Sequence, residues 1–291
     1  MAYAAGDVIE KRYRILGKVG SGAHGDVYRA RDLETRGEVA LKFLSAGIGL
    51  DPEYARRMER EALAMARLRG TNAVYVHGFR LNHDGSIYIV MEMLHGKNLE
   101  QFLKAAEKVG GRMKVARMLE LLRPVVDTLE AAHAQGIVHR DLKPGNIFVV
   151  DRDHGGGVRL LDFGLVKILG AESLTQGGTI AGTPSYIAPE AWKGDPRTLD
   201  QRIDVYAMGV IVFRALAGHV PYKARSLPLL MMWAQKGERP SLHALRPKLP
   251  EEIDGWVQRV LAIEPKDRYQ TVRAMWNALE GIVAQKAAAP Y

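Results

Sequence analysis

The chain has 291 residues, of which 47% are hydrophobic and 25% charged, so it can bury a core and is long enough for about two domains. It carries 41 Lys and Arg against 33 Asp and Glu, a net charge of +8 that favours anionic partners. The lack of cysteine excludes disulfides, thiolate metal sites and thiol nucleophiles, and no apolar stretch approaches the roughly 20 residues of a membrane span.

The first third of the chain is predicted to be a small sheet with one helix. Runs rich in β-branched and aromatic residues, separated by glycine-bearing turns, predict strands at 13–19, 27–31, 39–44, 74–81 and 86–91. Between the third and fourth strands, Asp51, Pro52 and Glu53 have the order of an N-cap, a first-turn proline and a first-turn acid. They predict the start of the helix.

Later residues follow helical periodicity. Apolar residues at helical spacing predict helices at 99–108, 114–135, 204–217, 251–262 and 271–285. Residues 137–190 form a long segment with short predicted strands at 147–150 and 159–161. Because loops on a rigid scaffold often carry function, this segment is the first place to look for a site.

A glycine-rich string occupies residues 20–27, Gly-Ser-Gly-Ala-His-Gly-Asp-Val. Glycines at this spacing let backbone N–H groups approach a phosphate without interference from Cβ atoms. A dinucleotide-binding fingerprint would open a helix here, whereas the run that follows Val27 is β-prone. The string therefore predicts a strand–turn–strand flap over phosphates.

Lys42 lies on the otherwise apolar predicted strand 39–44. A carboxylate on the following helix could hold its ammonium group against phosphates. Glu61 is the preferred partner because it lies beside the apolar face of that helix, and Glu59 is a competing partner that the sequence leaves open.

Three further motifs follow in order. Residues 139–146 read His-Arg-Asp-Leu-Lys-Pro-Gly-Asn, residues 162–164 read Asp-Phe-Gly, and residues 188–190 read Ala-Pro-Glu. With the glycine-rich string and Lys42, these motifs resemble the eukaryotic-type (Hanks-type) protein kinases, and most closely the bacterial serine/threonine kinases. The resemblance covers about residues 13–279, and no catalytic position departs from it.

The resemblance implies an α+β, bilobal protein-kinase fold, with a small antiparallel β-sheet lobe bearing one helix and a larger, mainly α-helical lobe. The implied boundaries are an N-terminal extension at 1–12, the small lobe at 13–94 and the large lobe at 95–285. The activation segment would span 162–190, and residues 286–291 would be a tail or the start of a linker.

The resemblance also implies serine/threonine protein kinase activity with ATP and Mg²⁺, or Mn²⁺, as cofactors. Asp141 would be the catalytic base, and Lys143 would neutralise the γ-phosphate. Lys42, held by Glu61, would bind the other phosphates, while Asn146 and Asp162 would hold the metal. The remaining ATP-contacting residues implied in this way are Val19, Gly20, Ser21, Gly22, Ala23, His24, Gly25, Asp26, Val27, Ala40, Met91, Glu92, Met93 and Phe148.

Regulation and substrate binding are implied around the activation segment. Thr183, in Gly-Thr-Pro, would belong to the substrate loop of the serine/threonine class. Thr179 is the first candidate for phosphorylation, followed by Thr175 and Ser173. A phosphate there would be clamped by Arg140, with Lys167 as a second cation. Two structural relations are also implied, a bridge from Glu190 to Arg268, and backbone N–H groups of the catalytic loop bound by Asp204.

The implied partners are ATP and proteins with serine or threonine acceptors, with a homodimer for trans-autophosphorylation. The implied location is cytoplasmic, as a free protein or as the cytosolic domain of a membrane-anchored receptor kinase. A pseudokinase scaffold is the main alternative, disfavoured because Lys42, Asp141 and Asp162 are all present. A nucleic-acid-binding protein is disfavoured because the basic residues form no stripe with interleaved aromatics, and a small-molecule kinase by the substrate-loop motifs.

Overall fold

The computed structural model describes residues 3–22, 25–43, 67–82, 87–163, 184–193 and 199–288. These residues fall into two compact units that divide between His95 and Gly96, here called the N-terminal unit and the C-terminal unit. Among the described residues, no helix is both long enough and apolar enough to cross a membrane.

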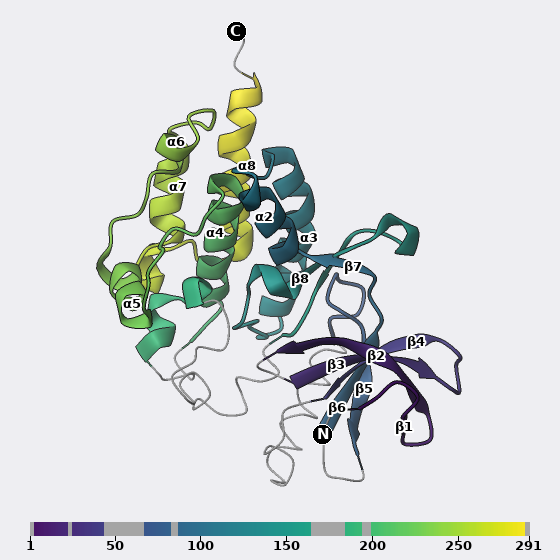
Figure 1. The fold of residues 1–291 in the computed structure, drawn as a ribbon. Coiled ribbons are helices and arrows are strands. Elements are labelled where there is room, and N and C mark those ends of the chain that lie inside the picture. Colours follow the sequence, from purple (N-terminus) through teal and green to yellow (C-terminus); the bar gives the residue numbers. More distant parts are fainter. Residues whose placement is uncertain are drawn as a thin grey trace. The chain divides into compact units, whose positions relative to one another are not determined.

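The N-terminal unit is built on a six-stranded antiparallel sheet with the order β1-β2-β3-β4-β6-β5 (Figure 1). Its strands are β1 (Val8–Ile9), β2 (Tyr13–Gly22), β3 (Gly25–Asp32), β4 (Glu38–Phe43), β5 (Val76–Leu81) and β6 (Ile87–Glu92). All five predicted strands are present. The additional strand β1 is too short to carry a periodic pattern, and the helix predicted from Asp51 lies outside the described residues.

The strand register gives the two faces of this sheet different roles. Val27 pairs with Lys42, and Lys42 pairs with Ile89, so these side chains share one face. The opposite face carries a buried cluster of aromatic and aliphatic residues, against which Tyr3 packs. Its members are Ile9, Tyr13, Ile15, Tyr28, Ala30, Val39, Leu41, Phe43, Tyr88 and Val90. Burial of this cluster fixes which side chains must point the other way.

The C-terminal unit is mainly helical. Its helices are α2 (Leu99–Lys108), α3 (Val115–His133), α4 (Arg202–Ala217), α5 (Leu227–Lys236), α6 (Leu242–Leu245), α7 (Glu252–Val260) and α8 (Val272–Ala288). A three-stranded antiparallel sheet joins β7 (Gly96–Asn98), β8 (Ile147–Val150) and β9 (Val158–Leu160). The five predicted helices and both predicted strands are present, whereas α5, α6 and β7 are additions to the sequence-based prediction.

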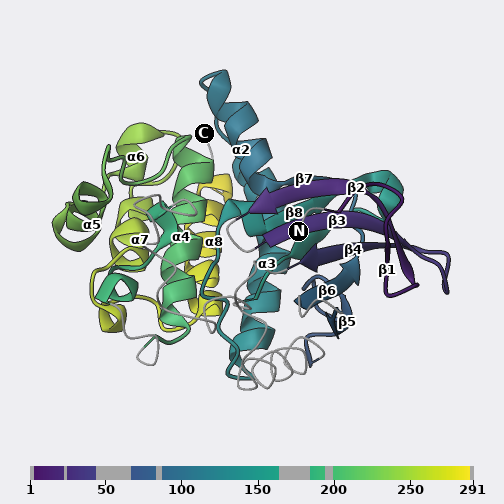
Figure 2. The same cartoon turned by 60° about the horizontal axis from the view of Figure 1, so that its bottom comes forward.

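Helix α4 lies at the centre of this unit, between α3, α7 and α8 (Figures 1 and 2). Every residue from Ile203 to Ala217 is buried. A Cβ atom at Gly209 would lie 2.6 Å from a methyl carbon of Val260, so only glycine allows α7 to approach this closely. Gly218 ends the helix with a positive φ of 82°. Polar side chains on α4 are therefore held in fixed positions.

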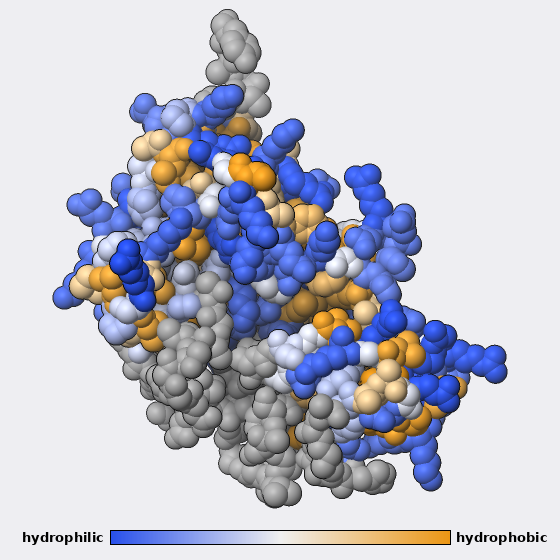
Figure 3. Space-filling model, viewed as in Figure 1, coloured by the Kyte–Doolittle hydropathy of each residue, from blue (hydrophilic) through white to orange (hydrophobic). Residues whose placement is uncertain are grey.

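Hydrophilic side chains dominate the visible surface of the C-terminal unit (Figure 3). Its large apolar side chains are internal, as Trp256 on α7 and Trp276 on α8 illustrate with 1% and 0% exposure. Helix α2 begins with a capping box, in which Asn98 and Gln101 exchange side chain to backbone hydrogen bonds. The start of α2, directly after β7, is thereby fixed.

Candidate active site

The loop that follows α3 is held by a buried carboxylate. Asp204, in the first turn of α4, is 1% exposed and accepts hydrogen bonds from the backbone N–H groups of His139 and Arg140, at 2.8 and 3.0 Å. Arg140 has a positive φ of 63°, a conformation that needs such support in a residue with a side chain. The predicted contact between Asp204 and this loop is present.

His133, at the end of α3, shares the same carboxylate. Its ring nitrogen Nε2 lies 2.8 Å from Oδ2 of Asp204, and both side chains are almost fully buried. This histidine was not among the predicted site residues, although a histidine in the last turn of a buried helix indicates a polar partner. Asp204 therefore ties the end of α3 as well as the loop.

Two polar side chains of this loop, Lys143 and Asn146, donate hydrogen bonds to a third loop residue, Asp141. The Lys143 ammonium group donates to Oδ2 of Asp141 at 2.7 Å, and the Asn146 amide donates to the backbone oxygen of Asp141 at 2.8 Å and to its Oδ2 at 3.2 Å. The side chains of Asp141 and Lys143 are 22% and 23% exposed, so a reactant can reach them. This constellation combines a carboxylate, a cation and an amide within one short loop.

Asn146 and Asp162 lie at the same end of the hairpin formed by β8 and β9. Asn146 ends the short 3-10 helix η1 (Pro144–Asn146) directly before β8, while Asp162 follows β9 after one residue. The backbone N–H of Leu161 donates to the backbone oxygen of Asn146 at 2.8 Å, which joins the two flanks. Sequence positions 16 residues apart (162 − 146) are thereby brought together.

These two residues suit a hard divalent cation. Because Nδ2 of Asn146 makes both contacts with Asp141, its amide oxygen Oδ1 can serve as a metal ligand, and the carboxylate of Asp162 is the second candidate ligand at this end of the hairpin. Within the described ranges there is no group of three or more His, Asp or Glu residues that would form a closed cage. Two protein oxygens fit a cation such as Mg²⁺, which keeps waters and binds substrate phosphates.

The backbone around Asp162 is fixed by buried neighbours. Phe163 is 1% exposed and packs against the ring of His139, with 4.8 Å between the ring centroids. Nε2 of His139 in turn lies 2.9 Å from the backbone oxygen of Leu161. Asp162 has a positive φ of 53°, so these contacts hold it in a strained conformation.

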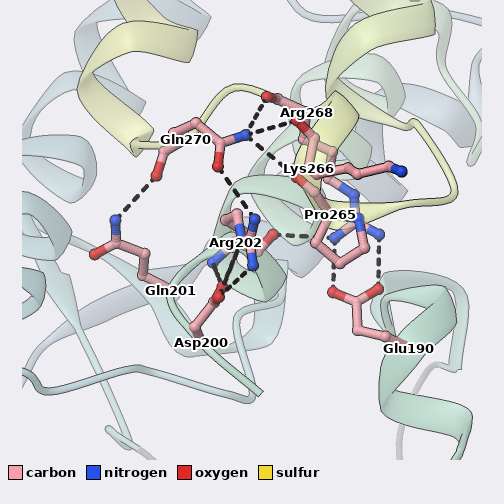
Figure 4. A network of polar contacts seen from close by, with 8 residues as sticks. All are labelled: Glu190, Asp200, Gln201, Arg202, Pro265, Lys266, Arg268 and Gln270. Carbon is pink, nitrogen blue, oxygen red and sulfur yellow. Dashed lines mark hydrogen bonds and ion pairs between the residues drawn. The ribbon is translucent and has the colours of Figure 1, made fainter. Parts of the chain in front are cut away.

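Arg268 forms a buried ion pair with Glu190 further along the chain (Figure 4). Arg268 donates from both terminal nitrogens to the Glu190 carboxylate, at 2.8 and 2.6 Å, as predicted. Its remaining donors reach the backbone oxygens of Ala262, Ile263 and Arg202. Arg268 is fully buried, and the Tyr206 ring lies 4.9 Å from the guanidinium carbon. Arg268 thus joins the 3-10 helix η7 (Pro189–Lys193) to the first turn of α4.

In the N-terminal unit, the glycine-rich string lies across the β2–β3 hairpin. Gly20 pairs with Val27, and Gly22 pairs with Gly25, whose φ of 118° favours glycine. The two predicted strands that flank the turn are therefore present, while Ala23 and His24 at the turn lie outside the described residues. Hydrogen bonds from Lys18 and then from Ser21 hold the pKa of the Asp26 carboxyl below its usual range.

The other predicted nucleotide contacts of this unit lie on one face of the sheet. Val27, Lys42 and Ala40 share that face with Met91, because Ala40 pairs with Met91 across β4 and β6. Lys42 is 5% exposed, so its stem is buried among apolar neighbours. Glu92 ends β6 and exchanges hydrogen bonds with the backbone of Tyr75.

The remaining predicted site residues divide into two groups. Val19 is on β2 with 56% exposure, Met93 follows β6 and is half-buried, and Phe148 lies on β8 in the C-terminal unit. Others lie outside the described residues: Ala23, His24, Glu59, Glu61, Lys167, Ser173, Thr175, Thr179 and Thr183. The structure therefore leaves the choice between Glu61 and Glu59 where the sequence left it.

Comparison with known proteins gives the class of this chain. The family model described as the protein kinase domain matches residues 13–278, and the chain belongs to that family. Over 282 residues it is 36% identical to the serine/threonine-protein kinase PknL of Mycobacterium tuberculosis, which covers 96% of this chain and 68% of PknL. It is 31% identical to the serine/threonine-protein kinase PrkC of Bacillus subtilis, over 93% of this chain and 40% of PrkC.

Solved structures of kinase domains support the same family assignment. The crystal structure of the PknI kinase domain of Mycobacterium tuberculosis matches with a TM-score of 0.72 and 31% identity, covering 97% of this chain and 99% of that one. The protein is a serine/threonine protein kinase of the bacterial type, and its family uses ATP and a divalent metal ion. The family and fold class inferred from the motifs are thus confirmed.

Proposed function

We propose that Asp141 is the catalytic base with which this kinase transfers the γ-phosphoryl group of ATP to serine and threonine hydroxyls of proteins. The observation that carries this proposal is the arrangement of Asp141, Lys143 and Asn146 on a loop held by the buried Asp204. Catalysis of phosphoryl transfer depends mainly on positioned charges, because the transition state is loose and the charge of the transition state is spread over several oxygens.

Each residue of the loop has its own task in this proposal. Asp141 accepts a hydrogen bond from the acceptor hydroxyl, orients its oxygen, and takes the proton as the new O–P bond forms and the bond to ADP breaks. Lys143 lies 2.7 Å from that carboxylate and neutralises charge on the γ-phosphoryl oxygens. Lys42, with Glu61 as its partner, binds the other phosphates, and the β2–β3 hairpin supplies backbone N–H groups.

We propose Mg²⁺ as the resident metal, with Mn²⁺ as a substitute, bound by Asn146 and Asp162. These two residues would hold the ion, which would supply positive charge to neutralise the phosphate oxygens. Asn146 has a second task, because its amide nitrogen donates to the backbone oxygen and to the carboxylate of Asp141, while its amide oxygen would bind the metal. The reaction consumes ATP. We propose that it takes place in the cytoplasm.

Intact mass spectrometry of the purified protein, before and after incubation with Mg²⁺ and ATP, tests the proposal. We expect mass increases of one phosphate at a time in the wild type, and phosphate transfer to myelin basic protein or casein. The variant Asp141→Asn keeps the size of the side chain but lacks the carboxylate, and we expect it to show neither. Wild-type rates in Asp141→Asn would overturn the role of Asp141.

The activation segment is proposed to be regulated by phosphorylation of Thr179, with Thr175 and Ser173 as weaker candidates and with Arg140 and Lys167 as the cations that bind the phosphate. We propose that the reaction takes place between two copies of the chain. Autophosphorylation per molecule should then rise with protein concentration. The variant Thr179→Ala should remain at the activity of dephosphorylated enzyme after incubation with ATP, and full activation of this variant would contradict the assignment.

A further inference from the structure

A buried arginine in α4 has every donor engaged. Arg214 is 6% exposed, and all five of its N–H groups donate hydrogen bonds. Two go to the Glu107 carboxylate at 2.8 and 3.1 Å, two to the Glu100 carboxylate at 2.5 and 3.2 Å, and one to the Tyr186 hydroxyl oxygen at 2.7 Å. We call Arg214, Glu100, Glu107 and Tyr186 the α4 arginine cluster.

Helix geometry explains how α2 supplies both carboxylates. Glu100 and Glu107 are seven residues apart (107 − 100), which is about two helical turns, so both lie on the same face of α2. Their side chains are 21% and 25% exposed, whereas Arg214 is 7% exposed at its side chain. Burial by itself lowers the pKa of the Arg214 guanidinium, but its hydrogen bonds to Glu107 and Glu100 outweigh burial and raise the pKa. The cluster is therefore a fixed ionic group.

Tyr186 connects this group to a different part of the chain. It ends the 3-10 helix η6 (Pro184–Tyr186), which begins directly after Thr183, and it lies four residues before Glu190 (190 − 186). The Tyr186 side chain is buried, which raises the pKa of its hydroxyl to about 12, so the group keeps its proton. Arg214 therefore contacts a neutral phenol at a fixed place.

Segment 184–190 is thus fastened at both ends by buried arginines. Arg214 holds its beginning through Tyr186, and Arg268 holds its end through Glu190. Both arginines are tied to α4, since Arg214 is part of that helix and Arg268 donates to the Arg202 backbone oxygen in its first turn. With the second end already fixed, the bond from Arg214 sets the orientation of the residues next to Thr183.

We propose that Arg214 is a positioning residue for the protein substrate, acting through Tyr186 on the segment that follows Thr183. This inference rests on the proposed function, in which Thr183 belongs to the substrate loop. The bond acts on the affinity for the acceptor protein and leaves the affinity for ATP unchanged, because the side-chain hydrogen bonds of Arg214 within the described residues reach only α2 and η6, and none of them reaches Asp141, Lys143 or Asn146.

The variant Tyr186→Phe tests the link, because it removes the hydroxyl and keeps the ring and both ion pairs. Its matched control is Tyr206→Phe, which removes a hydroxyl from a fully buried tyrosine on α4 that makes no hydrogen bond within the described part of the chain. The kinetic constants kcat, KM for myelin basic protein and KM for ATP are measured for both variants and the wild type.

We expect Tyr186→Phe to raise KM for the acceptor protein about three- to tenfold, the effect of losing one hydrogen bond, with KM for ATP unchanged. Tyr206→Phe should leave both constants at wild-type values. Equal changes of the two KM values in Tyr186→Phe, or the same shift in Tyr206→Phe, would show a general structural effect and overturn the proposal.

Arg214→Lys keeps the charge but has fewer donors, and it provides the second half of a double-mutant cycle. If Arg214 acts through Tyr186, adding Tyr186→Phe to Arg214→Lys raises KM for the acceptor no further. Fully additive shifts would contradict the link. A wild type that phosphorylates no acceptor would overturn the proposed function and this inference with it. If the wild type is active and Tyr186→Phe has the wild-type KM for the acceptor protein, only the inference is overturned.

Discussion

Arg268 and Glu190 form a two-pronged ion pair in which both guanidinium end nitrogens contact one carboxylate, at 2.8 and 2.6 Å. The two residues are 78 positions apart in the sequence, and the arginine is fully buried while the glutamate is 19% exposed. Planar groups paired in this way are stronger and more specific in geometry than a single contact. The pair fixes one end of segment 184–190.

Replacing Arg268 by alanine should therefore destabilise the protein by about 3–5 kcal/mol, because a carboxylate and three backbone oxygens lose their partner in the interior. Denaturant unfolding measures the loss. The control is Arg273→Ala, which removes a partly exposed arginine paired with the exposed carboxylates of Asp127 and Glu130 and should cost about 1 kcal/mol or less. Equal losses in the two variants would contradict the structural role of Arg268.

Asp204→Asn should slow catalysis and destabilise the protein. An amide has one acceptor oxygen, so the N–H groups of His139 and Arg140 can no longer both bind an anionic group. We expect kcat to fall about tenfold or more and the free energy of unfolding to fall by about 2 kcal/mol. Asp127→Asn, at an exposed position on α3, serves as the control and should change neither quantity measurably.

Asn146→Ala should raise the metal concentration that the reaction requires. The variant removes one proposed metal ligand and one support of Asp141, so we expect the Mg²⁺ concentration for half-maximal rate to rise about 10- to 100-fold. Chelation with EDTA should abolish wild-type activity, and added Mg²⁺ should restore it. Asn98→Ala disturbs only the start of α2, and its metal requirement should match that of the wild type. An unchanged requirement in Asn146→Ala would remove Asn146 from the metal site.

Stability should depend on pH through Asp32. Hydrogen bonds from Arg12, together with the backbone N–H groups of Glu34 and Thr35, lower the pKa of its carboxyl to about 2, although burial opposes this shift. A lowered pKa in the folded state stabilises the protein above the unfolded pKa, and the contribution is lost as the pH falls through the folded pKa.

The free energy of unfolding of the wild type should therefore exceed that of Asp32→Asn by about 1–2 kcal/mol at pH 7. This difference should shrink between about pH 4 and pH 2. Denaturant unfolding at a series of pH values checks this. Glu34→Gln, which removes the exposed partner of Arg12, should show little pH-dependent difference. A constant difference between wild type and Asp32→Asn across that range would exclude ionisation of Asp32 as the cause.

Periodicity predicts the long elements well because their burial depends on pattern. Helix α2 has the predicted bounds, 99–108, since a capping box defines its start and a basic residue, Lys108, closes its last turn. Helix α5 was missed because its apolar residues are not confined to one stripe, and Met232 and Trp233 remain exposed. Strand β7 was missed because three residues, two of them polar, carry no strand pattern.

Motifs predict which residues gather in the site, but not the contacts that hold them. The string 139–146 identifies Asp141, Lys143 and Asn146, and the structure brings these three within hydrogen-bond distance. The α4 arginine cluster was not predicted. The available signal was Arg214 itself, a charged residue within the buried apolar run of α4, since a buried charge requires partners. The identity of those partners, on α2 and η6, depends on tertiary packing that one sequence does not reveal.

The alternation of side chains on β4 has a consequence for insertions. Lys42 and Phe43 are neighbours in sequence, yet the phenylalanine belongs to the aromatic cluster and the lysine to the opposite face. Adding one residue between Glu38 and Lys42 would reverse this alternation. The Lys42 ammonium group would then point into the apolar interior of the sheet. The same addition in the exposed turn at 33–37 keeps both strands in frame. Length changes in this part of the chain are thus tolerated only between the strands.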